Sequence, residues 1–210
     1  MINALVTLYN PNHIVVENVE VIAKQVDKLF LCDNSYKNNR EIFESLKYYK
    51  NIYYIKNDRN LGLSLAFNKV LKNKDNNFRD EDYIIFFDQD SHIDELHINK
   101  LINEYEELIR RNINVGCLGP YFFNTSSNVI EVPKLKKLIY EETYSVKSVI
   151  TSSMLTTFGN LKKINFWNEN IFLDMADWDL CWRFIRCKLL CCMTKKVVMN
   201  HALGTGETHF

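Results

Sequence analysis

An uninterrupted apolar run that ends in two acidic residues constrains this chain more than any other feature. The run covers residues 83–87, and Asp88, Gln89 and Asp90 follow it directly. A short apolar run bounded by polar residues predicts a buried strand of a parallel sheet. Ligands collect at the carboxyl ends of such strands, and carboxylate oxygens suit a divalent cation. The acidic pair therefore indicates either a metal site or an acidic turn that caps the next helix.

Length and composition limit the class of protein. The chain has 210 residues, enough for one substantial core, and its 47% hydrophobic and 25% charged residues are typical of a globular domain. Lys plus Arg (26) balance Asp plus Glu (26), which argues against generic nucleic-acid binding. Apolar runs are too short to span a bilayer, and the first residues lack a signal-peptide pattern. We therefore expect a cytoplasmic protein.

Strand-like apolar runs alternate with segments whose apolar residues recur at helical spacing. The strand-like runs are residues 3–9, 28–32, 52–55, 83–87, 115–121, 148–155 and 197–200. The helix-like segments are residues 13–26, 40–49, 63–71, 94–111 and 172–186. This alternation predicts an α/β fold with a Rossmann-like, mostly parallel central sheet and helices on both faces.

Polar residues follow each of the first predicted strands, at the edge where parallel strands bring their ends together. They are residues 7–10, Asp33-Asn34-Ser35, the loop 57–62 and the acidic pair. Asp33 can accept an N–H group of a nucleotide base, so the edge predicts a nucleotide pocket. The chain has neither a GxGxxG motif after its first strand nor a phosphate-binding lysine loop. A cation is therefore expected to neutralise the diphosphate.

A second acidic group lies on the predicted helix 172–186. Asp177 is interpreted either as a helix cap or as a general base that faces an acceptor pocket. Asp179 and Arg183 are four residues apart, so they can pair and hold the end of the helix in place. Trp178 and Trp182 are expected to pack in the core, with stacking on a sugar as the alternative for Trp178.

Several other features leave their function open. His201 follows the last apolar run, where it is either an ordinary histidine or a ligand of the same cation or diphosphate. The basic cluster 134–137 predicts a solvated loop, with contact to an anionic acceptor or a membrane surface as the alternative. Cys32, Cys117 and Cys181 lie in apolar segments and are expected to be free, packed cysteines; Cys187, Cys191 and Cys192, followed by His201, could form a zinc site, but their spacing matches no CxxC pair and argues against it.

In their order and spacing, these motifs resemble the inverting glycosyltransferases of family 2, which have the GT-A fold, and more narrowly the rhamnosyltransferase-like members. The matching residues are Thr7-Leu8-Tyr9-Asn10-Pro11, Asp33-Asn34-Ser35, Asn57-x-x-Asn60-x-Gly62 with Ala66 and Asn68 beyond it, Asp88-Gln89-Asp90-Ser91, the block from Ala176 to Arg183, and His201. The resemblance implies transfer of rhamnose or a hexose from a UDP- or dTDP-sugar to a hydroxyl group. It implies a saccharide or lipid-linked saccharide acceptor in bacterial surface polysaccharide synthesis, and Mn²⁺ or Mg²⁺ as cofactor.

The resemblance also implies roles for individual residues. Asp33 would accept the N3–H of uracil or thymine, and the nucleotide site would be lined by Thr7, Tyr9, Asn10, Asn60 and Gly62. Asp88 would lie near the ribose and the metal ion, which Asp90 and His201 would hold. Asp177 would be the catalytic base, supported by the pair of Asp179 and Arg183. A single domain over residues 1–210 is expected, with a nucleotide-sugar-binding half (1–121) and an acceptor-side half (122–210).

Two departures from the family pattern leave alternatives open. Ala176 stands where the family usually has an acid, so that acid is either missing or replaced by Asp174. The chain ends soon after His201, which is typical of a short or truncated member. A non-catalytic, nucleotide-sugar-binding partner subunit is therefore the alternative function, and a nucleotidyltransferase is a weaker one. Peripheral contact with the inner face of the cell membrane, a partner subunit and a homo-oligomer remain open.

Overall fold

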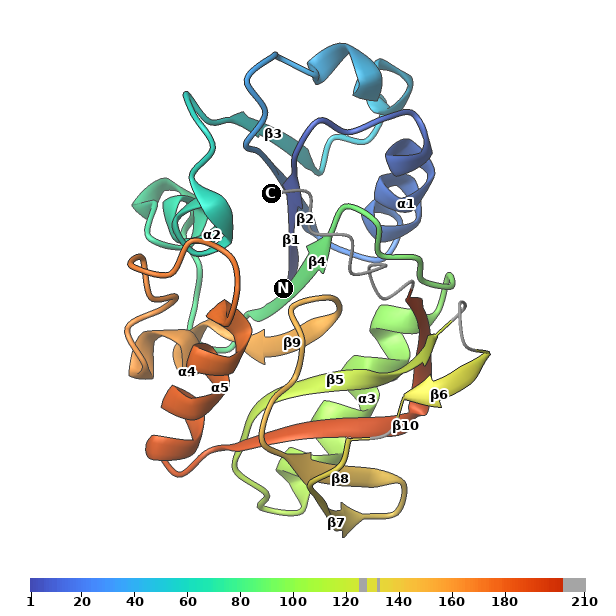
Figure 1. Ribbon diagram of the computed structural model, residues 1–210, viewed down its shortest axis with the longest axis vertical. Helices are drawn as coiled ribbons and strands as arrows, with labels where there is room; N and C mark the ends of the chain where they lie inside the picture. The colour runs from blue at the N-terminus through green and yellow to red at the C-terminus, as the bar shows by residue number, and fades with distance from the viewer. Residues whose placement is uncertain (125–127, 132, 202–210) are drawn as a thin grey trace.

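The computed structural model describes residues 1–124, 128–131 and 133–201, and its centre is one mixed sheet of ten strands (Figure 1). The strands are β1 (Ile2–Leu8), β2 (Lys28–Asp33), β3 (Ile52–Lys56), β4 (Tyr83–Asp88), β5 (Val115–Asn124), β6 (Val129–Glu131), β7 (Lys136–Tyr140), β8 (Thr143–Val146), β9 (Met154–Thr157) and β10 (Leu190–His201). Their order across the sheet is β3-β2-β1-β4-β9-β5-β10-β8-β7, and β6 pairs with β5.

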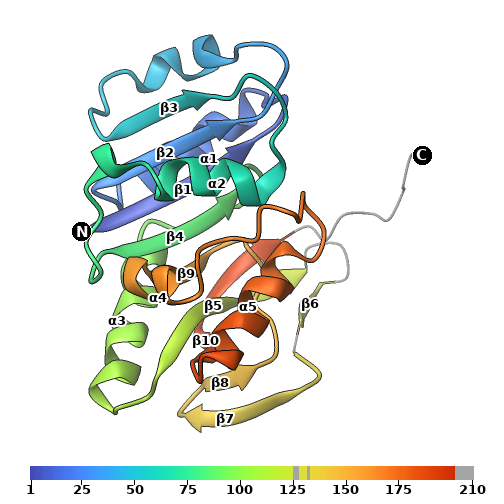
Figure 2. The ribbon, with the colours of Figure 1, turned by 90° about the vertical axis from the view of Figure 1, so that its left-hand side faces the viewer.

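Helices cover both faces of this sheet (Figure 2). They are α1 (Ile14–Ala23), α2 (Gly62–Leu71), α3 (His97–Arg110), α4 (Phe158–Lys163) and α5 (Ala176–Arg186), with 3₁₀ turns η1 (Arg40–Leu46) and η2 (Lys74–Asn76). The core cluster on one face contains residues of α2, α4 and α5, and the cluster on the other contains residues of α1, α3 and η1. Within the described part of the chain, we find no helix with the length and apolar character to cross a membrane.

The strands β3, β2, β1 and β4 pair in parallel, which confirms the predicted parallel core. Side chains alternate between its faces, so Leu5 belongs to one core cluster and the next residue, Val6, to the other. The register pairs Thr7 with Asp88, and Leu8 with Asp33. The polar residues that follow these strands therefore lie along one edge of the sheet.

The second half of the sheet is more irregular than the sequence indicates. β9 is antiparallel to both β4 and β5, β10 is parallel to β5, and β7 and β8 form an antiparallel hairpin beside β10. The apolar run 148–155 becomes a strand only from Met154 onward, because the residues before it form a loop. Residues 40–49, predicted as a helix, form the shorter η1. Lys136 and Lys137, predicted in a loop, are exposed residues of β7.

Candidate functional site

A cavity of about 380 Å³ lies at the carboxyl ends of β1 and β4, where the sequence predicts a nucleotide pocket. Its lining residues are Thr7, Leu8, Tyr9, Asn34, Asn60, Gly62, Leu63, Asp88, Gln89, Phe172 and Leu173. We call it the strand-end cavity. It brings together Thr7, Tyr9, Asn60, Gly62 and Asp88, as the sequence predicts. Phe172 and Leu173 are additions, because they come from the segment before α5, more than a hundred residues along the chain.

Gly62 determines how closely that distant segment approaches the cavity. Its φ of +69° lies in the left-handed region, and a Cβ at this position would lie 2.2 Å from the carbonyl oxygen of Phe172. That same oxygen accepts the backbone N–H of Leu63 at 2.7 Å. The side chain of Asn60 accepts the Gly62 N–H at 2.9 Å. The start of α2 can therefore contact the segment before α5 only because residue 62 lacks a side chain.

Two amide side chains that were not assigned a role from the sequence connect the loops around this cavity. Asn34 donates to the carbonyl of Gly62 at 2.9 Å and accepts from Asn57 at 3.0 Å. Gln89 accepts the backbone N–H of Tyr9 at 2.9 Å and donates to the Tyr9 carbonyl at 3.3 Å. Both residues belong to the polar motifs at the strand ends, and that position in the sequence is the feature from which their role at the cavity could have been predicted.

Asp33 is buried beside the strand-end cavity and is not one of its lining residues. Its carboxylate accepts the N–H and hydroxyl of Ser35, the amide of Asn39 at 3.1 Å and the hydroxyl of Tyr54. Burial alone would raise the pKa of Asp33, but these donors outweigh it and hold the pKa below its usual value. Asn10 donates its backbone N–H to the Ser35 hydroxyl at 2.7 Å. A base N–H that reached Asp33 would have to replace one of the present donors.

Asp88 lines the strand-end cavity, and two further carboxylates, Asp90 and Asp177, lie near enough for their charges to act on it. Burial, followed by the negative charges of Asp90 and Asp177, raises the pKa of Asp88 to about 7. Asp88 is the last residue of β4 and Asp90 lies two residues after it, whereas Asp177 lies in the first turn of α5. Their oxygen atoms are the ligand type that Mg²⁺ and Mn²⁺ prefer, and a divalent cation would relieve their mutual repulsion. The carboxylate chemistry of Asp88 and Asp90 therefore suits the expected cation, although the oxygens of the three carboxylates do not all lie within 4.8 Å of one another.

Asp177 has the properties of a proton acceptor near neutral pH. Burial raises its pKa to about 6, although the backbone N–H of Trp178, at 2.8 Å, partly offsets that rise. The backbone of Thr151 also lowers its pKa. The loop that contains Thr151 contacts the acidic turn as well, because the Ser152 hydroxyl hydrogen-bonds to Ser91, whose hydroxyl accepts the backbone N–H of Asp88 at 3.1 Å.

The predicted ion pair on α5 is present. Asp179 accepts from Arg183 at 2.7 Å, and both side chains are less than a quarter exposed. Arg183 also donates to the carbonyl of Ile164 at 2.7 Å and to the carbonyl of Phe166. The pair therefore attaches α5 to the segment that follows α4, in addition to closing one turn of its own helix.

The expectation that Trp178 and Trp182 pack in the core is wrong. They are 43% and 48% exposed, and their rings contact each other in a T-shaped, edge-to-face arrangement with 6.1 Å between ring centroids. The buried stripe of α5 consists of Ala176, Leu180, Cys181 and Phe184. The tryptophans lie four residues apart on a different side of the helix, which leaves Trp178 exposed next to Asp177.

The backbone of His201 ends β10, where it pairs with Asn124 of β5. The preceding residue, Asn200, forms an isolated bridge with His92, which lies two residues after Asp90. The end of β10 therefore lies beside the acidic turn. The predicted role of the His201 side chain lies outside the described residues.

The fold and the site together define the class of protein. A parallel α/β core whose strand ends form a polar cavity, with an acidic group at its mouth, has the architecture of nucleotide-binding proteins. The model of the family described as glycosyl transferase family 2 matches residues 4–164. The chain belongs to this family of enzymes.

Relatives and solved structures agree with this assignment. The chain is 28% identical over 202 residues to the uncharacterized glycosyltransferase MJ1057 of Methanocaldococcus jannaschii, and the match covers 89% of this chain and 64% of that protein. The chain thus spans less than two thirds of the length of that relative.

Among solved structures, similar folds include GalNAc-T7 with UDP, GalNAc and Mn²⁺ (TM-score 0.73, 12% identity, 97% of this chain and 44% of that one). They also include a mannosyltransferase of Pyrobaculum calidifontis with GDP-Man and Mn²⁺ (0.70, 11%, 98% and 58%) and TarS of S. aureus (0.67, 15%, 96% and 60%). These similarities show that the chain has a GT-A-like fold, as predicted.

Proposed function

We propose that this protein transfers a sugar from a nucleoside diphosphate to a hydroxyl group, with a cation held by Asp88 and Asp90 and with Asp177 as the base. The observation that carries the proposal is the electrostatic coupling of these carboxylates at the strand-end cavity, which Asp88 lines. Asp88 lines the cavity and its pKa responds to the charges of Asp90 and Asp177. This arrangement supports a diphosphate site and an acceptor site next to each other.

The donor in this proposal is a UDP- or dTDP-sugar with a rhamnosyl or hexosyl group. The hydrogen-bond donors around Asp33 keep its carboxylate charged, and a charged carboxylate can accept an N–H of the nucleotide base. The base would take the place of Asn39, which is only partly buried and bonds to one oxygen of Asp33. Mn²⁺ occurs with nucleotide ligands in two proteins of similar fold, which supports Mn²⁺ or Mg²⁺ here.

Asp177 removes the acceptor proton in the proposed reaction. A bound Mn²⁺ or Mg²⁺ would offset the negative charge that the leaving diphosphate gains. With a pKa of about 6, the carboxylate of Asp177 is mostly charged at neutral pH and can take the proton as the hydroxyl oxygen attacks the anomeric carbon. A single displacement of this kind inverts the anomeric configuration. Arg183 keeps Asp177 in position by attaching α5 to the chain around Ile164.

The acceptor we propose is a saccharide or lipid-linked saccharide of a bacterial surface polysaccharide. Exposed apolar side chains occur along α5 and in the segment before it, which supports an acceptor with both sugar and apolar parts and a peripheral contact with the membrane. They are Phe172, Leu173, Met175, Trp178, Trp182 and Ile185, each more than two fifths exposed. Trp178, next to the base, is suited to stack on the acceptor sugar.

A thermal-shift screen of UDP-, dTDP- and GDP-sugars, each with and without Mn²⁺, tests the donor site. Binding to the folded state alone raises the melting temperature, so the donor should stabilise the protein more with Mn²⁺ than without it. The stabilising donors are then assayed for transfer to saccharide acceptors. Stabilisation by none of them, or an equal effect without the cation, would contradict the proposal.

A non-catalytic, nucleotide-sugar-binding subunit is the second candidate function. Ala176, which stands where the family usually has an acid, is 2% exposed, and Asp174, in the segment before α5, is exposed. This candidate predicts that the protein binds the donor in the presence of Mn²⁺ but neither hydrolyses it nor transfers its sugar. Turnover of any donor by the purified chain that Asp177→Asn abolishes would exclude it.

A further inference from the structure

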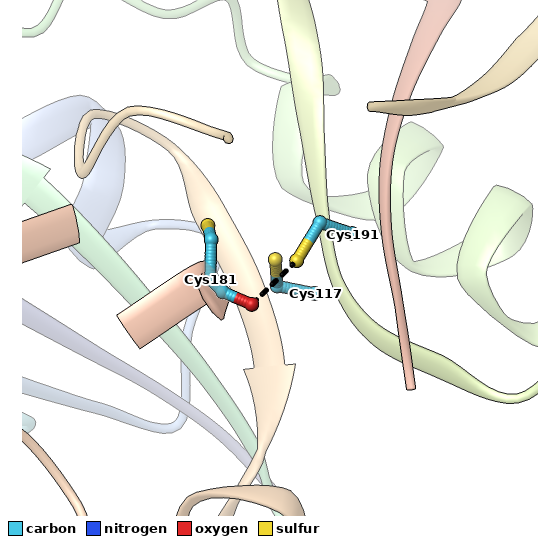
Figure 3. A group of neighbouring side chains, drawn as sticks. All are labelled: Cys117, Cys181 and Cys191. Carbon is cyan, nitrogen blue, oxygen red and sulfur yellow. Dashed lines mark hydrogen bonds between the residues drawn. The ribbon is translucent and has the colours of Figure 1, made fainter. Parts of the chain in front are cut away.

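Three cysteines outside the strand-end cavity meet in the core (Figure 3). Cys117 comes from β5, Cys181 from α5 and Cys191 from β10, and their Sγ atoms all lie within 4.8 Å of one another. Each side chain is at most 1% exposed. We call this group the thiol site. The proposed transfer reaction uses none of these residues.

The backbone brings these sulfur atoms together. Cys117 and Cys191 are register partners on neighbouring parallel strands, so their side chains leave the same face of the sheet side by side. Helix α5 packs on that face, and Cys181 belongs to its buried stripe. Cys192 belongs to the cluster on the opposite face and Cys187 is exposed. Of the three cysteines that lie close together in the sequence, Cys191 alone therefore belongs to the thiol site.

We propose that the thiol site binds one thiophilic metal ion, monovalent copper. An ion with bonds of about 2.3 Å to three sulfurs in a trigonal arrangement requires sulfur atoms about 4 Å apart. The present separations exceed that by less than 1 Å at most. Sulfur ligands prefer soft ions such as Cu⁺ and Zn²⁺ to the Mg²⁺ or Mn²⁺ expected at the carboxylates.

Coordination number and charge favour Cu⁺ over Zn²⁺. In the part of the chain that the structure describes, the group offers three cysteine ligands, whereas structural Zn²⁺ sites usually have four ligands. Binding of Cu⁺ with loss of a single thiol proton leaves the buried centre neutral, whereas Zn²⁺ requires the loss of two. The backbone N–H of Val149 points to the Cys181 sulfur at 3.3 Å and stabilises charge there.

Bound copper would join α5 to two strands of the sheet. At present, Cys191 donates a weak hydrogen bond to the Cys181 carbonyl at 3.5 Å, and metal–sulfur bonds would replace it (Figure 3). Asp177 lies one helical turn before Cys181 on α5. Occupation of the thiol site would therefore stabilise the helix that carries the proposed base. The inference itself does not depend on the transfer reaction.

Anaerobic titration of the reduced 210-residue chain with Cu⁺, in competition with a chromophoric Cu⁺ chelator, tests the inference. We expect one equivalent to bind and the melting temperature to rise. Cys117→Ala, Cys181→Ala and Cys191→Ala should each lower the Cu⁺ affinity at least tenfold. The matched controls, Cys187→Ala at the surface and Cys32→Ala elsewhere in the core, should retain it.

Circular dichroism shows which variants remain folded, and only folded variants are compared. X-ray absorption at the copper edge of the wild-type protein provides the answer if the core variants do not fold. Three sulfur neighbours at about 2.3 Å support the thiol site. Absence of stoichiometric binding, nitrogen or oxygen neighbours, or undiminished affinity in folded Cys181→Ala would overturn it.

Discussion

Asp33 and Asp88 are two strand-end carboxylates that the protein treats in opposite ways. Asp33 has hydrogen-bond donors on both oxygens, so its pKa lies below its usual value. Asp88 lies close to Asp90 and Asp177, so its pKa is raised to about 7. Charge on Asp33 therefore stabilises the folded state, whereas charge on Asp88 destabilises it. A carboxylate such as Asp88, whose charge lowers the stability of the folded protein, is typical of a ligand-binding site.

This difference predicts how Asp88→Asn changes stability with pH in the absence of divalent cations. The pKa of Asp88 rises from 3.8 to about 7 on folding, so the stability it contributes is present below about pH 4 and is lost as the pH rises through 7. At about pH 8 the substitution should raise the free energy of unfolding by on the order of 2 kcal/mol, with a smaller gain at about pH 5. Urea unfolding at both pH values measures this.

Asp33→Asn is the matched control, because its expected effect has the opposite sign. The pKa of Asp33 is lowered on folding, so this substitution should destabilise the protein at neutral pH, by an amount that shrinks in acid. Equal effects of the two substitutions, or a gain for Asp88→Asn that is independent of pH, would contradict the assigned charges.

Asp177→Asn should leave donor binding intact and lower the transfer rate by about 10² to 10⁴. The wild-type rate should fall below about pH 6, where Asp177 takes up a proton. Steady-state kinetics across pH, with calorimetry of donor binding, separates the two effects. Asp75→Asn, at an exposed position in η2, is the control for the loss of one negative charge. Transfer retained by the Asp177 variant would exclude its role as the base.

At the scale of elements, the parallel half of the sheet could be predicted because its signals are local. Each apolar run ends in a polar motif, and parallel pairing places Thr7 beside Asp88 and the residue after Thr7 beside Asp33. The second half depends on pairings that no local pattern indicates, such as β9 antiparallel to β4. Contacts between segments that are far apart in the sequence could not be predicted from the sequence either. The Gly62–Phe172 contact is an example, since the glycine shows only that a tight approach is feasible.

Gly62→Ala should open the contact between α2 and the segment before α5. The positive φ and the 2.2 Å approach to Phe172 both oppose a Cβ at this position. We expect a loss of about 1–3 kcal/mol in stability and weaker donor binding, measured by urea unfolding and calorimetry. At Gly159, which has no positive φ, a Cβ would lie 3.0 Å from Asp80, away from the cavity. Gly159→Ala should therefore affect stability without weakening donor binding, and the opposite pattern would contradict the assigned role of Gly62.

Arg183→Lys should loosen α5 without affecting the donor site. A lysine can pair with Asp179, but it cannot also reach the carbonyls of Ile164 and Phe166 with a planar fork of donors. We expect lower stability by about 1–3 kcal/mol and a lower transfer rate with unchanged donor affinity. Lys162, exposed and paired with Asp80, provides the control substitution Lys162→Arg. A loss of donor affinity equal to the loss of rate would indicate a general disturbance of the fold.

At the scale of the whole molecule, one continuous sheet connects the proposed donor and acceptor sides. Strands β1 to β4 end at the cavity, and β9 connects them to β5 and β10, on which α5 packs. The sequence predicts the family from residues distributed along this path. The donor base, the sugar and the acceptor depend on the shapes of surfaces that several segments build together, so they do not follow from single motifs.

Calorimetric titration of the purified chain with UDP and dTDP, with and without Mn²⁺, tests the central claim most directly when Asp90→Asn is measured beside the wild type. We predict that at least one of the two nucleotides binds the wild-type protein at least tenfold more tightly with Mn²⁺, and that this gain disappears in the variant. Binding that is indifferent to Mn²⁺ in the wild type, or a Mn²⁺ effect that survives in Asp90→Asn, would contradict a cation site at the end of β4.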